Sequence, residues 1–298
     1  MNFTPIELSA KDKIEKYLQA QVTQSSELTF LSLYIWRKAF NIQFAEHSGC
    51  VVLMFRDNDY PPSLRYPLGG GDKKSAIDAA VQSFVDKGFQ PRFYGLTKDM
   101  KDELETLYPN KYTITPMRDY FDYVYSVSQL ISLSGKDLHS KRNHVNSFMR
   151  TYDYLYKPLS KDDAQEIKET YDSWFFSSKK KPDYYLFSER QSIIDILENF
   201  DELGCKGAKL YANGKLCAFS IGERLNENTA VIHVEKADKN IKGAYATINQ
   251  MFLENEWSNF EYINREDDFG IAALRRAKKS YRPAFMVEKY SAISNEQS

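Results

Sequence analysis

The stretch Ala230-Val-Ile-His-Val-Glu-Lys-Ala237, followed by Asp238-Lys-Asn-Ile-Lys-Gly-Ala244, is the most informative part of this chain. The first segment is apolar and rich in β-branched residues, which predicts a buried strand. The second segment is polar and contains a glycine, and apolar residues at helical spacing then run from Tyr245 to Trp257. Because another apolar segment follows at 260–263, the stretch predicts a strand–loop–helix–strand unit.

A similar order of elements is predicted in the first half of the chain. Strand patterns at 42–45 and 50–55 precede Gly69-Gly-Gly71, a helix that begins after Asp72, and a strand at 89–96. The repetition is one of pattern rather than of residues. It predicts an α/β (α+β) chain of two tandem domains, each with a mixed central sheet flanked by helices. We place the domains at 1–155 and 156–298, with the expected active site in the second.

Composition narrows the class of protein. The chain has 298 residues, 42% hydrophobic and 27% charged, which is typical of a globular protein of one large or two smaller domains. A net charge of −1 provides no global attraction to nucleic acid or to an anionic membrane. The three cysteines contain no Cys-x-x-Cys pair, which argues against a zinc module or a disulfide scaffold. No apolar run of about 18 residues occurs, so we expect a cytoplasmic protein without a membrane span.

His233 and Glu235 are the first candidates for catalysis. Residues two apart on a regular strand point to the same face, so we expect the two side chains to lie together. The Glu235 carboxylate would act as general base toward an acceptor amine or hydroxyl. The alternative is a salt-bridged or hydrogen-bonded pair on a half-buried strand, without a catalytic role.

The loop after this strand is a candidate for binding donor phosphates. A glycine at the start of a helix lets a ligand approach the backbone, and the helix N-terminus favours an anion. Two lysines add positive charge to the same loop. The predicted donor-binding residues are Lys239, Lys242, Gly243 and Ala244.

The segment 135–146 is basic and reads as a helix with an apolar stripe. Lys141 and Arg142 would contact a phosphate backbone or a lipid headgroup. The alternative is a basic helix that only faces solvent. His139 and His144 are five residues apart and do not share a helix face, so no metal site is predicted.

A third charged stretch follows the last strand of the predicted unit, where α/β folds place their ligands. Its arginines and lysines could hold phosphates, and its carboxylates could attract an ammonium group. The alternative is a surface network in which acids and bases neutralise one another. The candidate substrate-binding residues in this stretch are Arg265, Asp268, Arg275 and Lys278.

Several hydrolase motifs are absent. The chain has no Gly-x-Ser-x-Gly elbow, no Gly-x-x-x-x-Gly-Lys-Ser/Thr loop and no His-Glu-x-x-His.

The same segments resemble a known bacterial family. The matching motifs are Asp122-Tyr-Val-Tyr125, Gly135-Lys-Asp-Leu-His-Ser-Lys-Arg-Asn-His144, Val234-Glu-Lys-Ala-Asp238, Gly243-Ala-Tyr-Ala-Thr-Ile-Asn-Gln250, Ile263-Asn-Arg-Glu-Asp-Asp-Phe-Gly-Ile271 and Arg275-x-x-Lys278. They are similar to an uncharacterised group related to the C-terminal domain of phosphatidylglycerol lysyltransferase, the multiple peptide resistance factor. The resemblance covers nearly the whole chain. It implies a tandem acetyltransferase-like (GNAT-type) fold, shared with the Fem-type aminoacyltransferases.

The resemblance implies transfer of an aminoacyl group, with aminoacyl-tRNA as donor, to a lipid, peptide or small-molecule acceptor. The expected partners are a tRNA acceptor end and an anionic lipid. No counterpart of the lysyltransferase's membrane-spanning half occurs in these residues. Of the acetyl-CoA signature Gln/Arg-x-x-Gly-x-Gly/Ala, the segment 240–245 keeps only the first glycine. An acyl-CoA donor, and with it a CoA-dependent N-acetyltransferase, is the first alternative. A non-catalytic protein that binds an anionic ligand is the second.

Overall fold

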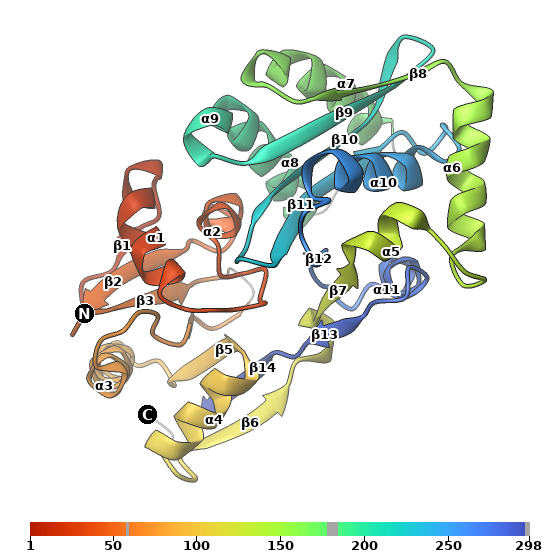
Figure 1. Cartoon of the computed structure of the whole chain (residues 1–298). Coiled ribbons are helices and arrows are strands. Elements are labelled where there is room, and N and C mark those ends of the chain that lie inside the picture. The colour runs from red at the N-terminus through yellow and green to blue at the C-terminus, as the bar shows by residue number, and fades with distance from the viewer. Residues whose placement is uncertain (58–59, 178–183, 296–298) are drawn as a thin grey trace. The chain divides into compact units, whose positions relative to one another are not determined.

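The computed structural model of the chain describes residues 1–57, 60–177 and 184–295 and contains two separate seven-stranded sheets, one in each of two units. Unit 1 comprises Met1–Phe121 and Val287–Ser298, and unit 2 comprises Asp122–Met286 (Figure 1). The boundary that we placed between residues 155 and 156 therefore falls inside unit 2. Each unit has its own seven-stranded mixed sheet flanked by helices, which confirms the predicted fold class.

Unit 1 is built on a sheet with the strand order β1-β2-β3-β4-β5-β14-β6. Its strands are β1 (Thr4–Pro5), β2 (Gln43–His47), β3 (Cys50–Phe55), β4 (Ser63–Leu64), β5 (Arg92–Leu96), β6 (Tyr112–Pro116) and β14 (Tyr290–Ser294). Its helices are η1 (Leu8–Ala10), α1 (Lys11–Gln19), α2 (Phe30–Trp36), α3 (Lys73–Val85), α4 (Lys98–Leu107) and η2 (Arg118–Tyr120).

Unit 2 is built on a sheet with the strand order β13-β7-β12-β11-β10-β9-β8. Its strands are β7 (Asp122–Ser126), β8 (Tyr154–Pro158), β9 (Lys206–Ala212), β10 (Lys215–Arg224), β11 (Thr229–Ala237), β12 (Tyr262–Asn264) and β13 (Phe285–Val287). Its helices are α5 (Val127–Ser132), α6 (His139–Thr151), η3 (Lys161–Asp163), α7 (Ala164–Phe176), α8 (Tyr184–Glu198), α9 (Phe200–Leu203), α10 (Ala244–Glu256) and α11 (Ala272–Lys279).

The two units share one strand–helix–strand motif. In unit 1, α3 connects β4 to β5, and these strands pair in parallel. In unit 2, α10 connects β11 to β12, which also pair in parallel. A parallel pair needs a crossover connection, and in both units a helix supplies it. The repetition of pattern seen in the sequence therefore corresponds to a repeated supersecondary unit.

Strand pairing explains why the observed boundary differs from the predicted one. β7 pairs with β12, so residues from Asp122 onward belong to the sheet of unit 2. The last strand, β14, lies between β5 and β6 and returns the chain's end to unit 1. Our boundary followed the order of elements along the chain, which contains no information about these long-range pairings.

Helices cover both faces of the unit 2 sheet. On one face, α10 packs across β9, β10 and β11, and Ala218 of β10 belongs to the same apolar core as Ile248 and Phe252 of α10. The next residue, Phe219, points to the opposite face because side chains alternate along a strand. There its ring lies 5.7 Å from that of Tyr171 in α7. β10 and β11 are therefore inner strands of the sheet, and β10 is packed by helices on both faces.

Local signals in the sequence predict some elements better than others. Asn213-Gly214 is a typical two-residue hairpin signal, and both residues have positive φ and join β9 to β10. By contrast, Ser188-Glu-Arg-Gln191 has the pattern of a helix start but lies inside α8, which already includes Tyr184. We did not predict α11 at all, because its alanines and cations give no apolar stripe.

No helix in the described part of the chain is long and apolar enough to cross a membrane. The three cysteines, Cys50, Cys205 and Cys217, are buried and free.

Candidate functional site

A group of polar side chains in unit 2 surrounds the carboxylate of Glu235 near the end of β11. We call Glu235, Asn249, Arg265, Lys141 and Tyr281 the Glu235 cluster. Asn249 of α10 donates its amide to Oε2 of Glu235 over 2.8 Å, and Arg265 donates from Nη2 to Oε1 over 2.7 Å. Only 13% of the Glu235 side chain is exposed. The carboxylate is therefore held from both sides and is close to the surface rather than sealed in the core.

Arg265 lies directly after β12, the strand that pairs in parallel with β11. The carboxyl ends of adjacent parallel strands meet at one edge of a sheet, which is how Arg265 reaches Glu235. Its side chain is 12% exposed, and its Nη1 atom is buried with no hydrogen-bond partner among the described residues. A buried guanidinium N–H without a partner costs free energy, so Nη1 is an unsatisfied donor within the cluster.

Lys141 and Tyr281 complete the cluster. The ammonium of Lys141 lies 4.1 Å from the centre of the Tyr281 ring, and the guanidinium carbon of Arg265 lies 4.8 Å from it. Burial lowers the pKa of Lys141, and the nearby positive charge of Arg265 lowers that pKa further, against the opposing effect of Glu235. Burial also raises the pKa of Tyr281 to about 12. Lys141 is thus a lysine shifted toward its neutral form beside a fixed cation.

His233 does not join Glu235, although strict alternation along the strand predicts that it should. The pairing of β10 with β11 passes from Ile221–Val234 to Gly222–Ile232, so His233 is an extra residue in a β-bulge. Its ring bonds to Glu223 and Glu266, both at 2.8 Å. The bulge therefore directs His233 to one face of the sheet, while Glu235 faces α10 on the other.

The environment of His233 favours its protonated form. The side chain is 1% exposed, and burial alone lowers its pKa. The hydrogen bonds and charges of Glu223 and Glu266 outweigh burial and raise the pKa of His233 to about 9. A histidine protonated at neutral pH cannot accept a proton, which favours the structural alternative for this residue.

Three of the predicted substrate-binding residues support the backbone around the cluster. Asp268 accepts two hydrogen bonds from Arg275, at 2.8 and 2.6 Å, and a third from the Tyr123 hydroxyl at 2.5 Å. These contacts, with burial opposing them, lower the pKa of Asp268 to about 2. The Lys278 ammonium donates to the carbonyl oxygens of Arg265 and Asp267. This arrangement matches the alternative in which acids and bases neutralise each other.

The predicted donor-binding loop lies against α6. Gly243 has φ +91°, and a Cβ atom built on it would lie 2.5 Å from the backbone oxygen of His144. The glycine thus allows α10 to begin in close contact with α6, which is a packing role. Ala244 is buried as the first residue of α10, while Lys239 and Lys242 are exposed.

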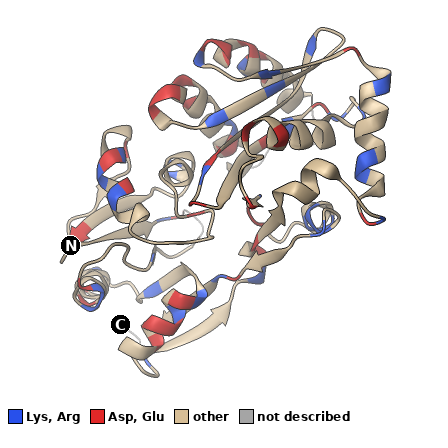
Figure 2. Ribbon diagram, in the orientation of Figure 1, with Lys and Arg blue, Asp and Glu red and all other residues tan. Residues whose placement is uncertain are grey.

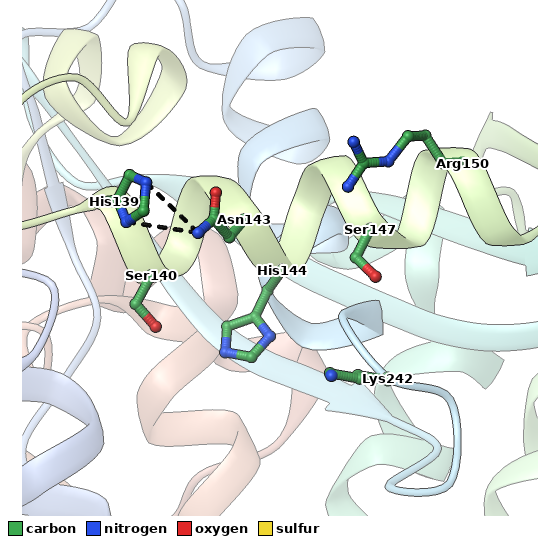
Figure 3. Close-up of a pocket in the computed structure, with 7 residues that line it drawn as sticks. All are labelled: His139, Ser140, Asn143, His144, Ser147, Arg150 and Lys242. Atoms are coloured by element: carbon green, nitrogen blue, oxygen red, sulfur yellow. Dashed lines mark hydrogen bonds between the residues drawn. The ribbon is translucent and has the colours of Figure 1, made fainter.

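Lys242 lies at a shallow hollow of about 490 Å³ along α6 (Figure 3). In Figure 3, His144 and Lys242 face each other across it, and Asn143 bonds back to His139. No carboxylate of the described residues lines the hollow. Its lining is His139, Ser140, Asn143, His144, Ser147, Arg150 and Lys242. Arg142 contributes elsewhere, because it donates to the Leu133 backbone oxygen at 2.7 Å and closes the turn before α6.

Of the predicted residues, Glu235, Arg265 and Lys141 have side chains in the Glu235 cluster. The structure adds Asn249 and Tyr281, which we did not predict. Asn249 is a polar residue on the buried face of a predicted helix, and that unusual position was the available signal. Nothing local in the sequence singles out Tyr281. No group of histidine, cysteine or acidic side chains suited to a metal ion occurs in the described residues.

Comparison with known proteins places this geometry in a family. This chain is 28% identical to an uncharacterised protein of Mycoplasmoides gallisepticum. The alignment covers 96% of this chain and 97% of that protein. A conserved protein of unknown function from Bacteroides thetaiotaomicron has the same fold, with a TM-score of 0.93 and 35% identity over 99% of this chain and 100% of that one.

More distant structures share the fold alone. L-PGS from Bacillus licheniformis has a TM-score of 0.68 at 18% identity, covering 96% of this chain and 92% of that one. A tandem GNAT protein from the clavulanic acid biosynthesis pathway has a TM-score of 0.54 at 7% identity, covering 100% and 99%. The predicted tandem GNAT-like architecture is confirmed. Residues 19–293 match the family described as phosphatidylglycerol lysyltransferase, C-terminal, and this chain belongs to that family.

Proposed function

We propose that this protein transfers an aminoacyl group to a hydroxyl of an anionic lipid of the phosphatidylglycerol type, at the Glu235 cluster. Membership of the lysyltransferase family supports the reaction class. The observation that carries the assignment to this site is the unpartnered Nη1 of Arg265, buried beside the half-buried Lys141. Aminoacyl-tRNA is the proposed donor.

Aminoacyl transfer passes through a tetrahedral intermediate with a negative oxygen, which fixed donors in a dry site stabilise. Arg265 is held by Glu235 at 2.7 Å, so its free Nη1 keeps a defined direction. In the proposed mechanism, Nη1 donates to the developing oxyanion. Because the guanidinium is preorganised, little reorganisation is needed as charge develops.

The acceptor hydroxyl must lose a proton as it attacks the acyl carbon. We predicted Glu235 as the base, but both of its oxygens already accept hydrogen bonds, from Arg265 and Asn249. Lys141, with its lowered pKa, is better suited, since a lysine shifted toward the neutral amine can accept a proton. We therefore assign to Lys141 the proton of the acceptor hydroxyl, which Lys141 returns to the terminal ribose hydroxyl of the tRNA as the ester bond between tRNA and aminoacyl group breaks. Glu235 positions Arg265.

The hollow on α6 is the proposed place for donor phosphates. Lys242 and Arg150 supply positive charge, while Ser140 and Ser147 supply hydroxyl donors, and no carboxylate of the described part lines it. Such a lining suits a phosphodiester better than an uncharged ligand. Acyl-CoA is a less suitable donor, because the segment 240–245 keeps only the first glycine of the acetyl-CoA signature.

The decisive experiment measures transfer of a labelled aminoacyl group from lysyl-tRNA or alanyl-tRNA to phosphatidylglycerol, with acetyl-CoA as a parallel donor. Arg265→Lys keeps a positive charge but loses the second guanidinium nitrogen, so the rate should fall about 100-fold, as for loss of one oxyanion donor. Arg282→Lys is the matched control, since the Arg282 side chain is 59% exposed and pairs with Asp137 at 3.2 Å. Unchanged transfer in the Arg265 variant, or transfer from acetyl-CoA alone, would refute the proposal.

A further inference from the structure

The segment that begins at Phe269 and continues through α11 has an unusual surface. Phe269 and Ile271 are large apolar residues whose exposed fractions are 47% and 55%. From 269 to 287 the sequence contains no Asp or Glu, but it contains five basic residues, Arg275, Arg276, Lys278, Lys279 and Arg282. In Figure 2 this helix carries blue and tan but no red. The segment therefore combines exposed apolar side chains with a local excess of positive charge.

The cations of α11 divide into two sets by the direction they face. Arg275 and Lys278 turn inward, to Asp268 and to the Arg265 carbonyl oxygen. Arg276 and Lys279 are exposed, and neither makes an ion pair within the described part of the chain. The three exposed alanines of the helix, Ala272, Ala273 and Ala277, flank these cations. Because alanine side chains are short, a flat partner can approach this outward face closely and meet its unneutralised positive charge.

The loop before α11 is built to project its apolar side chains. Phe269 has φ +47°, a left-handed conformation that is rare for a bulky residue. Asp267 accepts the Phe269 N–H and Asp268 accepts the Gly270 N–H, both at 3.0 Å. Arg275 fixes Asp268 in turn. These bonds therefore fix the shape of the loop, which leaves Phe269 and Ile271 exposed.

We infer that this surface, defined by Phe269, Ile271, Arg276 and Lys279, docks onto an anionic lipid bilayer. Apolar side chains next to lysines and arginines are typical of segments that lie in a membrane interface. The positive charge complements the negative surface of such a bilayer, and the apolar pair would enter the boundary between headgroups and acyl chains. A nucleic acid would use the cations but has no need for the exposed Phe269 and Ile271.

This inference rests on the proposed function, and it adds how the enzyme reaches its acceptor. The inward side of α11 contacts the Glu235 cluster, because Lys278 donates to the Arg265 carbonyl oxygen and Tyr281 lies two residues after the end of the helix. A bilayer held on the outward side would lie one helix away from the reacting groups. Docking would therefore raise the local concentration of lipid hydroxyls at the site.

The test is sedimentation of the full chain with vesicles of phosphatidylcholine, with and without phosphatidylglycerol. The wild-type protein should bind the mixed vesicles and leave pure phosphatidylcholine vesicles largely unbound. Arg276→Gln with Lys279→Gln should weaken binding about fivefold for each cation removed. Phe269→Asn with Ile271→Asp should weaken it at least about tenfold. Both apolar replacements suit their backbone, since asparagine tolerates positive φ and aspartate caps a helix, so folding should be kept.

Matched controls distinguish binding through the α11 surface from a general effect of the protein's charge. Val22→Asp adds a carboxylate at a residue 96% exposed in unit 1, and Lys98→Gln with Lys215→Gln removes two exposed cations elsewhere. These variants should bind vesicles like the wild type. Equal binding by the α11 variants, or no binding of wild-type protein to mixed vesicles, would overturn the inference. So would α11 variants that lose affinity for tRNA but not for vesicles.

Failure of the inference can be told apart from failure of the proposed function. Transfer to a short-chain phosphatidylglycerol dissolved as monomers needs no bilayer. The α11 variants should therefore transfer to this acceptor at the wild-type rate. Transfer without vesicle binding by the wild type would leave the function standing and remove the docking surface. Vesicle binding without any transfer would leave the docking surface standing and remove the proposed function.

Discussion

Arg265 bonds to Glu235 through Nη2 at 2.7 Å while its Nη1 has no partner in the described part of the chain. The two residues come from adjacent parallel strands, with Arg265 immediately after β12 and Glu235 near the end of β11. Pairing one guanidinium nitrogen fixes the plane of the whole group, which directs the other nitrogen. The buried guanidinium is therefore paired through Nη2 and, among the described residues, unpaired through Nη1.

Replacing Glu235 by glutamine tests whether this pairing matters for transfer. The substitution keeps the size of the side chain but removes the negative charge that holds Arg265. We expect kcat for aminoacyl transfer to fall at least about tenfold, with little change in KM, because the lost interaction acts in the transition state. Glu261→Gln, an exposed residue of the same unit, should have no effect. A folded Glu235→Gln protein that transfers at the wild-type rate would remove Glu235 from the mechanism.

Lys141 provides a prediction about pH. Burial and Arg265 lower its pKa, so the neutral amine should become available below the ordinary lysine range. The rate of transfer should rise with pH and level off above that lowered pKa. Lys141→Arg keeps the positive charge but stays protonated, so it should lose about 100-fold or more in rate.

The control for this change is Lys215→Arg on an exposed strand end. If Lys141 acts only through its charge, the Lys141→Arg variant will instead keep most of its activity. A pH profile identical to that of the wild type in this variant would also contradict the proton-accepting role.

His233 should make the stability of the fold depend on pH. Its pKa of about 9 in the folded chain lies above the ordinary 6.5, so its contribution is complete below pH 6.5. It is lost as pH rises through 9, because the unfolded chain releases the proton first. The free energy of unfolding should fall by on the order of 3 kcal/mol across this range. Chemical denaturation of the wild type at several pH values measures it.

The variant His233→Asn should be less stable and should lose this pH dependence between 6.5 and 9. His139→Gln, which replaces an exposed histidine, should keep it. The same pH dependence in the wild type and in His233→Asn would show that the buried imidazolium is not its source.

Gly243 tests how closely α10 approaches α6. Alanine at this position combines a positive φ with a contact of 2.5 Å between Cβ and the His144 oxygen. We expect Gly243→Ala to destabilise the fold by about 2 to 4 kcal/mol, from backbone strain and overpacking together. Gly135 also has positive φ but has open space around it, so Gly135→Ala should cost only about 1 kcal/mol. Similar losses in thermal or urea unfolding of both variants would contradict the packing argument.

Much of the secondary structure of unit 2 follows from local sequence. The β-branched run at 230–237 forms β11, and the Asn213-Gly214 turn forms the hairpin of β9 and β10. Both elements depend on signals from neighbouring residues, for which backbone propensity and side-chain alternation are sufficient. The site was less accessible to the same reasoning. A single bulge at His233 reverses the expected pairing with Glu235, and a bulge depends on partners across the sheet.

The sequence by itself determined the repeated strand–helix–strand pattern, the family and three charged members of the site, since periodicity and motifs are properties of neighbouring residues. Only the tertiary structure decided which charges meet. Arg265 bonds to Glu235, whereas Asp268 bonds to Arg275 and His233 bonds to Glu223 and Glu266. These pairings depend on the order of strands in the sheet, on the bulge at His233 and on α11. The hydrophobic pattern of the sequence shows none of these three features. Distance in space determines which charged groups pair, and burial determines which of their atoms are left without a partner for a substrate.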